Sequence, residues 1–286
     1  MELIFSAALC SVLVSILLKF AKQKGFDALQ MIAWNYAIAS IFSYLWFKPD
    51  LAHISVSQTP WWLIIVLGMV LPSIFLCLAK SLHTAGIVKT EIAQRLSVVL
   101  SLLAAYFLFQ EQFNQLKMLG IGLGIIAVLC IIFSQTNSSQ DSNSSLDRKG
   151  VMYLLSVWIG YAVVDILLKY TTNLGLQFPV TLTLMFFCSF ILSIAYLLFR
   201  KADWNIKNIF AGFVLGLLNF ANIALYVKAH ILLKDSPAIV FAGMNILVVL
   251  FGVIAGLIIF KEKLKVITAL GLVLGLGGVV CLGLAI

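Results

Sequence analysis

Long apolar segments alternate with short polar connections along almost the whole chain. A helix needs about 20 predominantly apolar residues to cross the hydrocarbon core of a bilayer. Charge-poor stretches bounded by polar or turn-forming sequence predict ten such helices. They cover residues 2–21, 29–47, 60–81, 87–109, 116–133, 150–170, 178–199, 208–229, 237–259 and 266–286. The pattern therefore predicts an all-α integral membrane protein.

The polar pattern also divides the chain into two similar halves. Residues 134–149 are rich in serine and asparagine, which predicts a linker. On either side of it, "ILLKF" (16–20) aligns with "ILLKY" (166–170), and "FQEQFNQLKMLG" (109–120) aligns with "FKEKLKVITALG" (260–271). Such self-similarity indicates an internal repeat. We expect two five-helix repeats, residues 1–133 and 150–286.

An odd number of helices in each repeat has a consequence for topology. The second repeat must enter the membrane from the side opposite to the first. Inverted repeats of this kind recur in secondary transporters, where the solute site lies near the membrane midplane between the repeats. We therefore expect ten transmembrane helices as two inverted five-helix repeats, with a central cavity lined by the first four helices of each.

Composition supports a membrane protein and excludes several other classes. Of the 286 residues, 63% are hydrophobic and 10% are charged, whereas soluble domains average about 25% charged residues. The net charge of +8 comes from positive residues scattered between apolar segments, which is typical of membrane-flanking positions and not of nucleic-acid binding. Neither the five cysteines nor the three histidines form a ligand cluster, so we expect no metal and no cofactor.

The two halves end in similar sequences, residues 79–129 and 227–280. Each has a lysine that closes its third helix, a glutamate after its fourth helix and a glycine-rich last helix: Lys80 and Lys228, Glu111 and Glu262, Gly120 and Gly124, Gly271 and Gly275. With these features the halves resemble the two EamA-type domains of the drug/metabolite transporter (DMT) superfamily. The resemblance covers essentially the whole chain and implies a membrane transporter with both termini inside the cell.

The chain also departs from the EamA-type pattern at four positions. Gln110 and Lys261 replace the glycine that usually precedes the glutamate. Val98 and Val249 stand near the place where the fourth helix of such a repeat often has a proline. These departures leave the superfamily resemblance intact but give no guide to the substrate.

Charged residues within the predicted helices are the first candidates for a solute site. A charge at the bilayer centre costs about 2.5–3.5 kcal/mol on insertion scales, so it usually faces a cavity or a partner. Arg95 is the deepest cation, and its planar guanidinium suits a carboxylate or a phosphate. Glu91 lies four residues earlier, so the two side chains share a helix face and can form an ion pair.

Asp165 and Lys169 repeat this acid-first spacing in the second half. If they line the cavity, Lys169 attracts an anionic group and Asp165 takes up a proton or a substrate amine, as Glu91 would in the first half. Lys19 has no acidic partner one turn earlier and is a further candidate for a cavity cation. The alternative is that the acid–base pairs are structural and that both lysines extend toward the membrane surface.

Amide and phenol side chains add hydrogen-bonding candidates for solute binding: Asn35, Gln94, Asn219, Asn222, Tyr226 and Asn245. Asn219, Asn222 and Tyr226 lie on one stripe of the eighth helix, as a cavity wall requires. Hydrogen bonding between helices is the alternative role for each of them.

We expect a secondary active transporter, an exporter or exchanger of a small-molecule metabolite, that works by alternating access and draws on a proton gradient or on solute exchange. A lipid-linked-sugar flippase and a membrane interaction protein without transport are the alternatives. No nucleotide-binding loop and no catalytic cluster is present in the sequence, so we expect neither ATP use nor enzymatic activity. We place the protein in the bacterial inner (plasma) membrane, as a monomer or as a homodimer joined through its glycine-rich helices.

The orientation of the chain is predicted in two conflicting ways. With Lys19, Arg95 and Lys169 set aside, the odd-numbered connections hold about twelve positive residues and the even-numbered ones about four. Because positive residues favour the cytoplasmic side, this count predicts both termini outside the cell. The resemblance to EamA-type transporters implies both termini inside.

Overall fold

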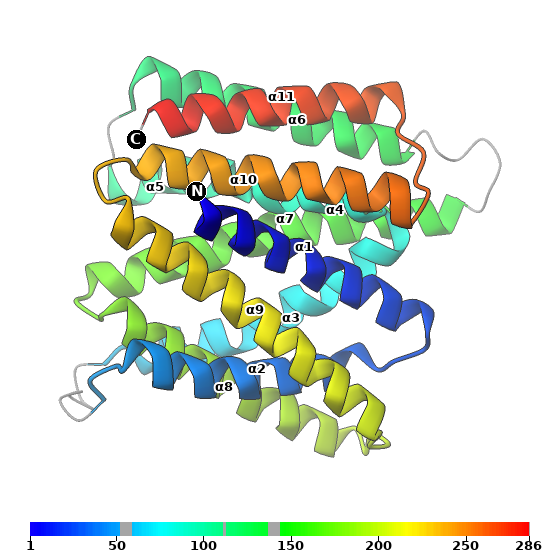
Figure 1. Ribbon diagram of the computed structural model, residues 1–286, viewed down its shortest axis with the longest axis vertical. Coiled ribbons are helices and arrows are strands. Elements are labelled where there is room, and N and C mark those ends of the chain that lie inside the picture. The colour runs from blue at the N-terminus through cyan, green and yellow to red at the C-terminus, as the bar shows by residue number, and fades with distance from the viewer. Residues whose placement is uncertain (52–58, 111–112, 137–143, 286) are drawn as a thin grey trace.

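Helices form every regular element in the residues that the structure, a computed structural model, describes: 1–51, 59–110, 113–136 and 144–285 (Figure 1). They are α1 (Glu2–Gln23), α2 (Ala28–Phe47), α3 (Trp61–Thr84), α4 (Ile87–Arg95), α5 (Ser97–Phe109), α6 (Gln115–Thr136), α7 (Ser144–Asn173), α8 (Phe178–Phe199), α9 (Ile206–Leu232), α10 (Pro237–Ile254), the π-helical η1 (Ala255–Ile259) and α11 (Val266–Leu284).

Most of these helices are long and apolar enough to cross a membrane. Nine such spans are found among the described residues, with α4 and α5 forming one span and α10 and η1 another. The tenth predicted span corresponds to α2, which has 20 residues and carries the amides Gln30 and Asn35. Both of these side chains are buried against other helices. The prediction of an all-α, multi-pass membrane protein is confirmed.

The spans lie side by side, and consecutive spans run in opposite directions (Figure 1). Both termini lie at one end of the spans, which we call the terminal face; we call the other end the distal face. α1 ends at the distal face, and α4 and α9 begin there. α9 ends and α10 begins at the terminal face. Each helix end can therefore be assigned to one of two faces.

The helices follow one another in layers along the longest axis of the molecule (Figure 1). α6 and α11 form one end and pack on α4, α5 and α10, with which they share one buried apolar cluster. α1, α3, α7 and α9 come next, and α2 and α8 form the other end. A second buried cluster, which includes Tyr36 and Phe186, joins α2 and α8 to these central helices. The middle of the molecule is thus built by both halves of the chain.

Contacts between the two halves come in exchanged pairs. α1, the first span, packs against α9 and α10; α7, the first span after the linker, packs against α3 and against α4 and α5. α2 packs against α9 as α8 packs against α3. Three further contacts join spans of the same rank: α2 with α8, α4 with α10 and α6 with α11. In these contacts the two sets of five spans have equivalent neighbours.

Glycines make the closest of these helix contacts. On α9, Gly212 and Gly216 face α2, where a Cβ added at Gly216 would lie 2.7 Å from the Ile38 Cβ and 2.9 Å from the Asn35 carbonyl oxygen. On α10, Gly252 faces α4 in the same way. Small residues allow helix backbones to approach closely in a membrane, where water does not drive the association. These glycines thus serve helix packing within the chain.

α6 extends further than the apolar pattern predicted. Its last turns include Ser134 and Gln135, which belong to the predicted linker and are buried. The Ser134 Oγ lies 2.5 Å from the Thr268 Oγ1 of α11, and the Gln135 Oε1 accepts a 2.7 Å hydrogen bond from Lys89. Because these polar side chains have partners on neighbouring elements, they continue the helix although they end the apolar run. Linker residues 137–143 lie outside the described residues.

We expect Gly216→Ala to destabilise the protein, because the new methyl group would collide with the backbone of α2. Overpacking of this kind costs about 1–3 kcal/mol. Gly122→Ala on α6 is the matched control, since a Cβ added at Gly122 meets nothing within 4 Å and alanine is favoured over glycine inside a helix. Thermal unfolding in detergent should give a lower Tm for the first variant only. Equal Tm values for the two variants would contradict the close α2–α9 contact.

Candidate functional site

A cavity of about 710 Å³ lies between the two halves of the chain. Its wall is formed by α1, α2, α3, α4, α5, α7, α8, α9 and α10, whereas α6 and α11 contribute no residue to it. The cavity extends from the middle of these helices to the terminal face, where Phe178 begins α8 and His230 lies near the end of α9. These are the helices that the sequence predicted to line a central cavity. The volume suits a small organic molecule.

The cavity wall contains seven of the residues expected to contact a solute or a proton. They are Gln94, Arg95, Asp165, Asn219, Asn222, Tyr226 and Asn245. Four other candidates, Lys19, Asn35, Glu91 and Lys169, do not line the cavity. The structure thus brings polar residues of α4, α7, α9 and α10 to one space and leaves both candidate lysines outside it.

Arg95 places a guanidinium in the cavity wall at the last residue of α4. The helix is interrupted directly afterwards at Leu96, whose carbonyl oxygen accepts a 2.9 Å hydrogen bond from the Trp158 Nε1 of α7. The Arg95 Nη2 donates a 2.6 Å hydrogen bond to the Ser11 Oγ of α1. The buried Nε has no hydrogen-bond partner among the described residues. A guanidinium has five N–H donors, so Arg95 retains donor capacity for an anionic group beyond its bond to Ser11.

Glu91 lies one turn before Arg95 but does not form the predicted ion pair with it. Its side chain is 1% exposed, and its Oε1 accepts a hydrogen bond from the Ser15 Oγ of α1. Its Oε2 is buried without a hydrogen-bond partner in the described part of the chain. The expected pairing is wrong because two hydroxyl groups of α1 take the side chains of Arg95 and Glu91 separately. Glu91 therefore sits behind the cavity wall, between α1 and the Gly252 face of α10.

Asp165 of α7 is accessible within the cavity. Its Oδ2 accepts a 3.2 Å hydrogen bond from the Ser101 Oγ of α5, and Arg95 is the cation whose charge acts on it. The predicted ion pair between Asp165 and Lys169 is not formed in the structure as described. The Asp165 side chain bonds across to α5 and leaves Lys169, one turn closer to the terminal face, outside the cavity lining. One acidic and one basic side chain thus face the same cavity.

Asparagines and a tyrosine form the wall that α9 contributes to the cavity. The Asn219 Nδ2 donates a 3.1 Å hydrogen bond to the Oδ1 of Asn35, which is fully buried behind it on α2. The Asn222 Oδ1 has no hydrogen-bond partner among the described residues. The Tyr226 ring packs edge-on against His230, with 4.6 Å between the ring centroids. Asn35 therefore positions a cavity residue, whereas Asn222 and Tyr226 remain available to an occupant of the cavity.

Several polar residues of the wall were missed by the reasoning from sequence. They are Ser11, Ser15, Tyr36, Ser97, Tyr161 and His230. The signal for some of them was present, because Ser11 and Ser15 precede Lys19 at four-residue spacing on one face of α1, and Tyr161 precedes Asp165 at the same spacing. Serines are common in membrane helices, so the spacing of Ser11 and Ser15 did not by itself indicate a role. Their hydrogen bonds to α4 show that role.

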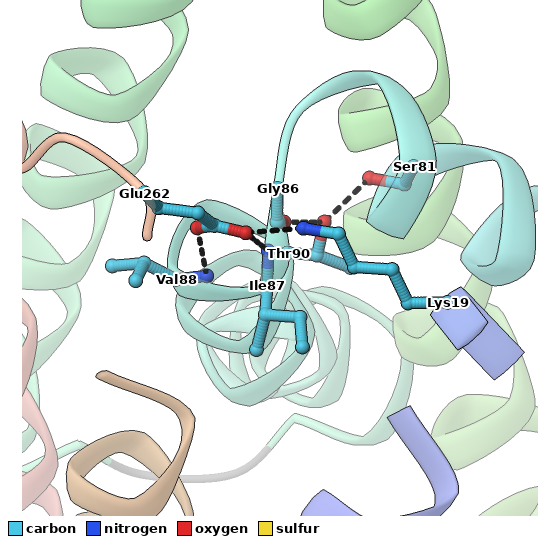
Figure 2. A network of polar contacts seen from close by, with 7 residues as sticks. All are labelled: Lys19, Ser81, Gly86, Ile87, Val88, Thr90 and Glu262. Carbon is cyan, nitrogen blue, oxygen red and sulfur yellow. Dashed lines mark hydrogen bonds and ion pairs between the residues drawn. The ribbon is translucent and has the colours of Figure 1, made fainter. Parts of the chain in front are cut away.

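Lys19 has a partner at the distal face, one turn of α1 beyond the cavity-lining Ser15. Its ammonium group forms an ion pair with Glu262 and lies 4.4 Å from the centroid of the Phe260 ring. Figure 2 shows the Glu262 carboxylate between Lys19 and the first residues of α4. The expectation that Lys19 is an unpaired cavity cation is therefore wrong, because an acidic residue from the other half of the chain neutralises it. Glu111, which aligns with Glu262, lies outside the described residues.

The described residues contain no cluster suited to a metal ion. No group of three or more His, Cys, Asp or Glu side chains comes together in that part of the chain. The five cysteines are present as free thiols on separate helices.

Comparisons with known proteins give relatives in sequence and in structure. The chain is 40% identical over 288 residues to an uncharacterized protein of Haemophilus influenzae, and the match covers 98% of this chain and 97% of the relative. A protein of known crystal structure has the same fold, with a TM-score of 0.59 over 99% of this chain and 96% of that protein, at 15% identity. The fold is thus shared by a protein with little similarity in sequence.

A family model covers nearly the whole chain. The model of the EamA-like transporter family matches residues 2–133 and 148–284. These two stretches meet at the serine-rich linker and include every residue of the cavity wall. The chain therefore belongs to the EamA-like transporter family, within the drug/metabolite transporter superfamily.

Proposed function

We propose that this protein is a secondary active transporter that moves a small metabolite across a membrane by alternating access. The observation that carries the proposal is the cavity of about 710 Å³, whose lining includes helix ends of the terminal face and none of the distal face. Polar and charged groups inside an apolar bundle are costly and mark solute pathways. Membership of a transporter family supports the same conclusion.

The two halves, residues 1–133 and 150–286, act as inverted repeats that move against each other. Each half contributes five spans, so the second half crosses the membrane in the direction opposite to the first. The exchanged contacts of α1 with α9 and of α7 with α3 support this relation. If the two halves exchanged their arrangements, the cavity would close at the terminal face and open at the distal face.

The solute carries an anionic group that Arg95 binds. The guanidinium lines the cavity, and its planar fork suits a carboxylate or a phosphate. Asp165 offers a negative charge in the same cavity for an amine of the solute or for a proton. Asn222 and Tyr226 supply hydrogen bonds from the α9 wall, and Gln94 and Asn245 add amides from α4 and α10.

Energy comes from the proton gradient or from exchange of one solute for another. Asp165 and Glu91 are the acidic residues within the spans that lie at or next to the cavity. The positive charge of Arg95 lies close enough to influence the carboxyl groups of both Asp165 and Glu91. The charge of Asp165 in turn influences the hydroxyl groups of Tyr161 and Tyr226. A proton taken up by either carboxyl group would change the charge next to Arg95 and so the binding of an anionic solute.

The protein resides in the bacterial inner (plasma) membrane. The 40% identical relative comes from the bacterium Haemophilus influenzae. The nine apolar spans among the described residues are of the length that a lipid bilayer requires.

Replacing Arg95 should impair transport more than folding. Purified protein in liposomes is tested with a solute found by a thermal-shift screen of amino acids, nucleosides, sugar phosphates and cationic drugs. Loss of a charge-assisted hydrogen bond costs about 1.5–3 kcal/mol, so Arg95→Gln should weaken uptake of an anionic solute roughly 10- to 100-fold. Uptake by the Arg95→Lys variant should fall between that of the wild type and that of Arg95→Gln, because a lysine lacks the planar fork.

Arg200→Gln is the matched control for Arg95, since Arg200 is an exposed residue that follows α8 at the distal face. It should transport at the wild-type rate. Normal transport by folded Arg95→Gln protein would contradict the proposed solute site. A complete lack of transport by the wild type, for every solute that shifts its Tm, would contradict the proposed function.

Replacing the proton-carrying carboxyl group should separate exchange from gradient-driven uptake. Asp165→Asn and Glu91→Gln remove one titratable group each and keep its approximate shape. The variant that loses the coupling proton should still exchange labelled for unlabelled solute but should no longer accumulate solute in response to a pH gradient. If both variants keep gradient-driven accumulation, protons do not pass through these residues.

A reporter fused after Ile286 should decide between the two predicted orientations. An enzyme that is active only in the cytoplasm and another that is active only outside it are each attached to the same position. Cytoplasmic activity alone would support the orientation implied by the EamA resemblance. External activity alone would support the count of positive residues, most of which border the distal face.

A further inference from the structure

One polar cluster joins the two halves of the chain at the distal face (Figure 2). Glu262 follows η1 in the second half, and its Oε1 accepts a 2.7 Å hydrogen bond from the Ile87 N–H at the start of α4 in the first half. Its Oε2 accepts a 3.2 Å hydrogen bond from the Val88 N–H. The ammonium group of Lys19, from α1, pairs with the same carboxylate. Three segments that are far apart in the sequence thus meet at one side chain.

The electrostatics of this cluster are mutually favourable. The first N–H groups of a helix have no partner inside the helix, and the helix dipole places positive potential at this end. The Glu262 carboxylate therefore binds two sources of positive charge, the start of α4 and the ammonium group of Lys19. The Phe260 ring lies 4.4 Å from the Lys19 Nζ and shields it from the side. The cluster is a charge-assisted contact and is stronger than a neutral hydrogen bond.

Gly86 provides the space for the carboxylate. Its φ of +94° lies in the region that favours glycine, and a Cβ added there would lie 2.7 Å from the Glu262 Oε2. Any other residue at position 86 would push the carboxylate away from the first N–H groups of α4. The local sequence is therefore adapted to receive Glu262, beyond what a helix start alone requires.

The cluster also lies on the line between the cavity and the distal face. On α1, Ser11 and Ser15 line the cavity and bond to Arg95 and Glu91 of α4, and Lys19 follows one turn further on. α1 and α4 are thus held together at three successive turns, and Glu262 closes the last of them. Beyond this point the described lining of the cavity contains no residue.

We infer that Lys19, Glu262 and the start of α4 form a latch that keeps the cavity closed at the distal face. The inference rests on the proposed alternating access. To admit or release solute at the distal face, α1 and α4 of the first half must separate from the segment after η1 of the second half. The carboxylate of Glu262 leaves the Ile87 and Val88 N–H groups and the Lys19 ammonium group, and water replaces it at all three.

Removing either charge of the latch should open the cavity to the distal face. The assay places one thiol in the wall, Leu71→Cys, after the five native cysteines have been replaced by alanine. A membrane-impermeant maleimide is applied to vesicles of each orientation, so that labelling from either face is measured separately. In the otherwise unchanged protein, we expect labelling mainly from the terminal face.

Lys19→Met and Glu262→Gln should raise labelling from the distal face by about tenfold, the change that loss of one charge-assisted hydrogen bond produces. Lys22→Met is the matched control, because Lys22 is an exposed lysine on the next turn of α1. It should leave labelling unchanged. Unchanged distal labelling in Lys19→Met and Glu262→Gln, or an equal rise in Lys22→Met, would overturn the latch. Labelling from the terminal face shows whether each variant has kept its cavity.

A second experiment tests the latch if the single variants do not fold. Lys19→Cys with Glu262→Cys is joined by a short, cleavable reagent that reacts with two thiols. The joined protein should still bind solute from the terminal face, as a shift in Tm, but should not transport it, and cleavage should restore transport. Transport by the joined protein would overturn the latch. Because labelling needs no solute, wild-type protein that fails to transport would reject the proposed function and leave the test of the latch intact.

Discussion

A charged side chain inside an apolar bundle needs a partner or a water-filled space, and in this protein α1 supplies most of the partners. Ser11 bonds to Arg95, Ser15 bonds to Glu91 and Lys19 pairs with Glu262. The three residues of α1 are four apart and therefore lie on one face, one turn above another. The cavity wall, the buried carboxyl group and the closed distal face all depend on this single face of α1.

The interruption between α4 and α5 gives Arg95 its place. A continuous α-helix would bond the Leu96 carbonyl oxygen to the N–H four residues later, but here this oxygen accepts hydrogen bonds from the Val99 N–H, three residues later at 3.1 Å, and from Trp158 of α7. The other half has an irregular turn in the corresponding span, where α10 passes into η1. π-helical turns are found frequently at functional sites. Both halves thus combine rigid apolar packing with one irregular turn in the fourth span.

Much of the architecture was predictable from sequence, because the apolar length of a membrane span is set by the bilayer. The membrane spans and the helices that line the cavity follow from this constraint and from the repeat, whereas the predicted linker 134–149 is too long at both ends, because α6 continues to Thr136 and α7 begins at Ser144. The limits of α6 were less predictable, since Ser134 and Gln135 look like linker residues until their partners on other elements are known. Local sequence reports the end of an apolar run, whereas tertiary hydrogen bonds decide the end of the helix.

The site was predictable in part, and the errors have one cause. Acid and base residues four apart on one helix suggest local ion pairs, as for Glu91 with Arg95 and Asp165 with Lys169. In the structure the acidic residues bond instead to serines of other helices, because packing places a hydroxyl closer than the neighbouring turn. The partner of Lys19 lies 243 residues away in the sequence, so no local pattern reveals it.

The two halves of the fold differ at the start of their fourth spans, α4 and α10. α4 follows Gly86 and offers its first N–H groups to a carboxylate, whereas α10, the equivalent span of the second half, begins with Pro237. In the alignment of the halves Pro237 corresponds to Gly86, and its ring and fixed negative φ cannot provide the space that Gly86 gives to a carboxylate. If the halves exchange roles, the two end states differ in free energy, and each 1.4 kcal/mol of difference changes their ratio tenfold. The resting population of the carrier would then be set by a residue that touches no solute.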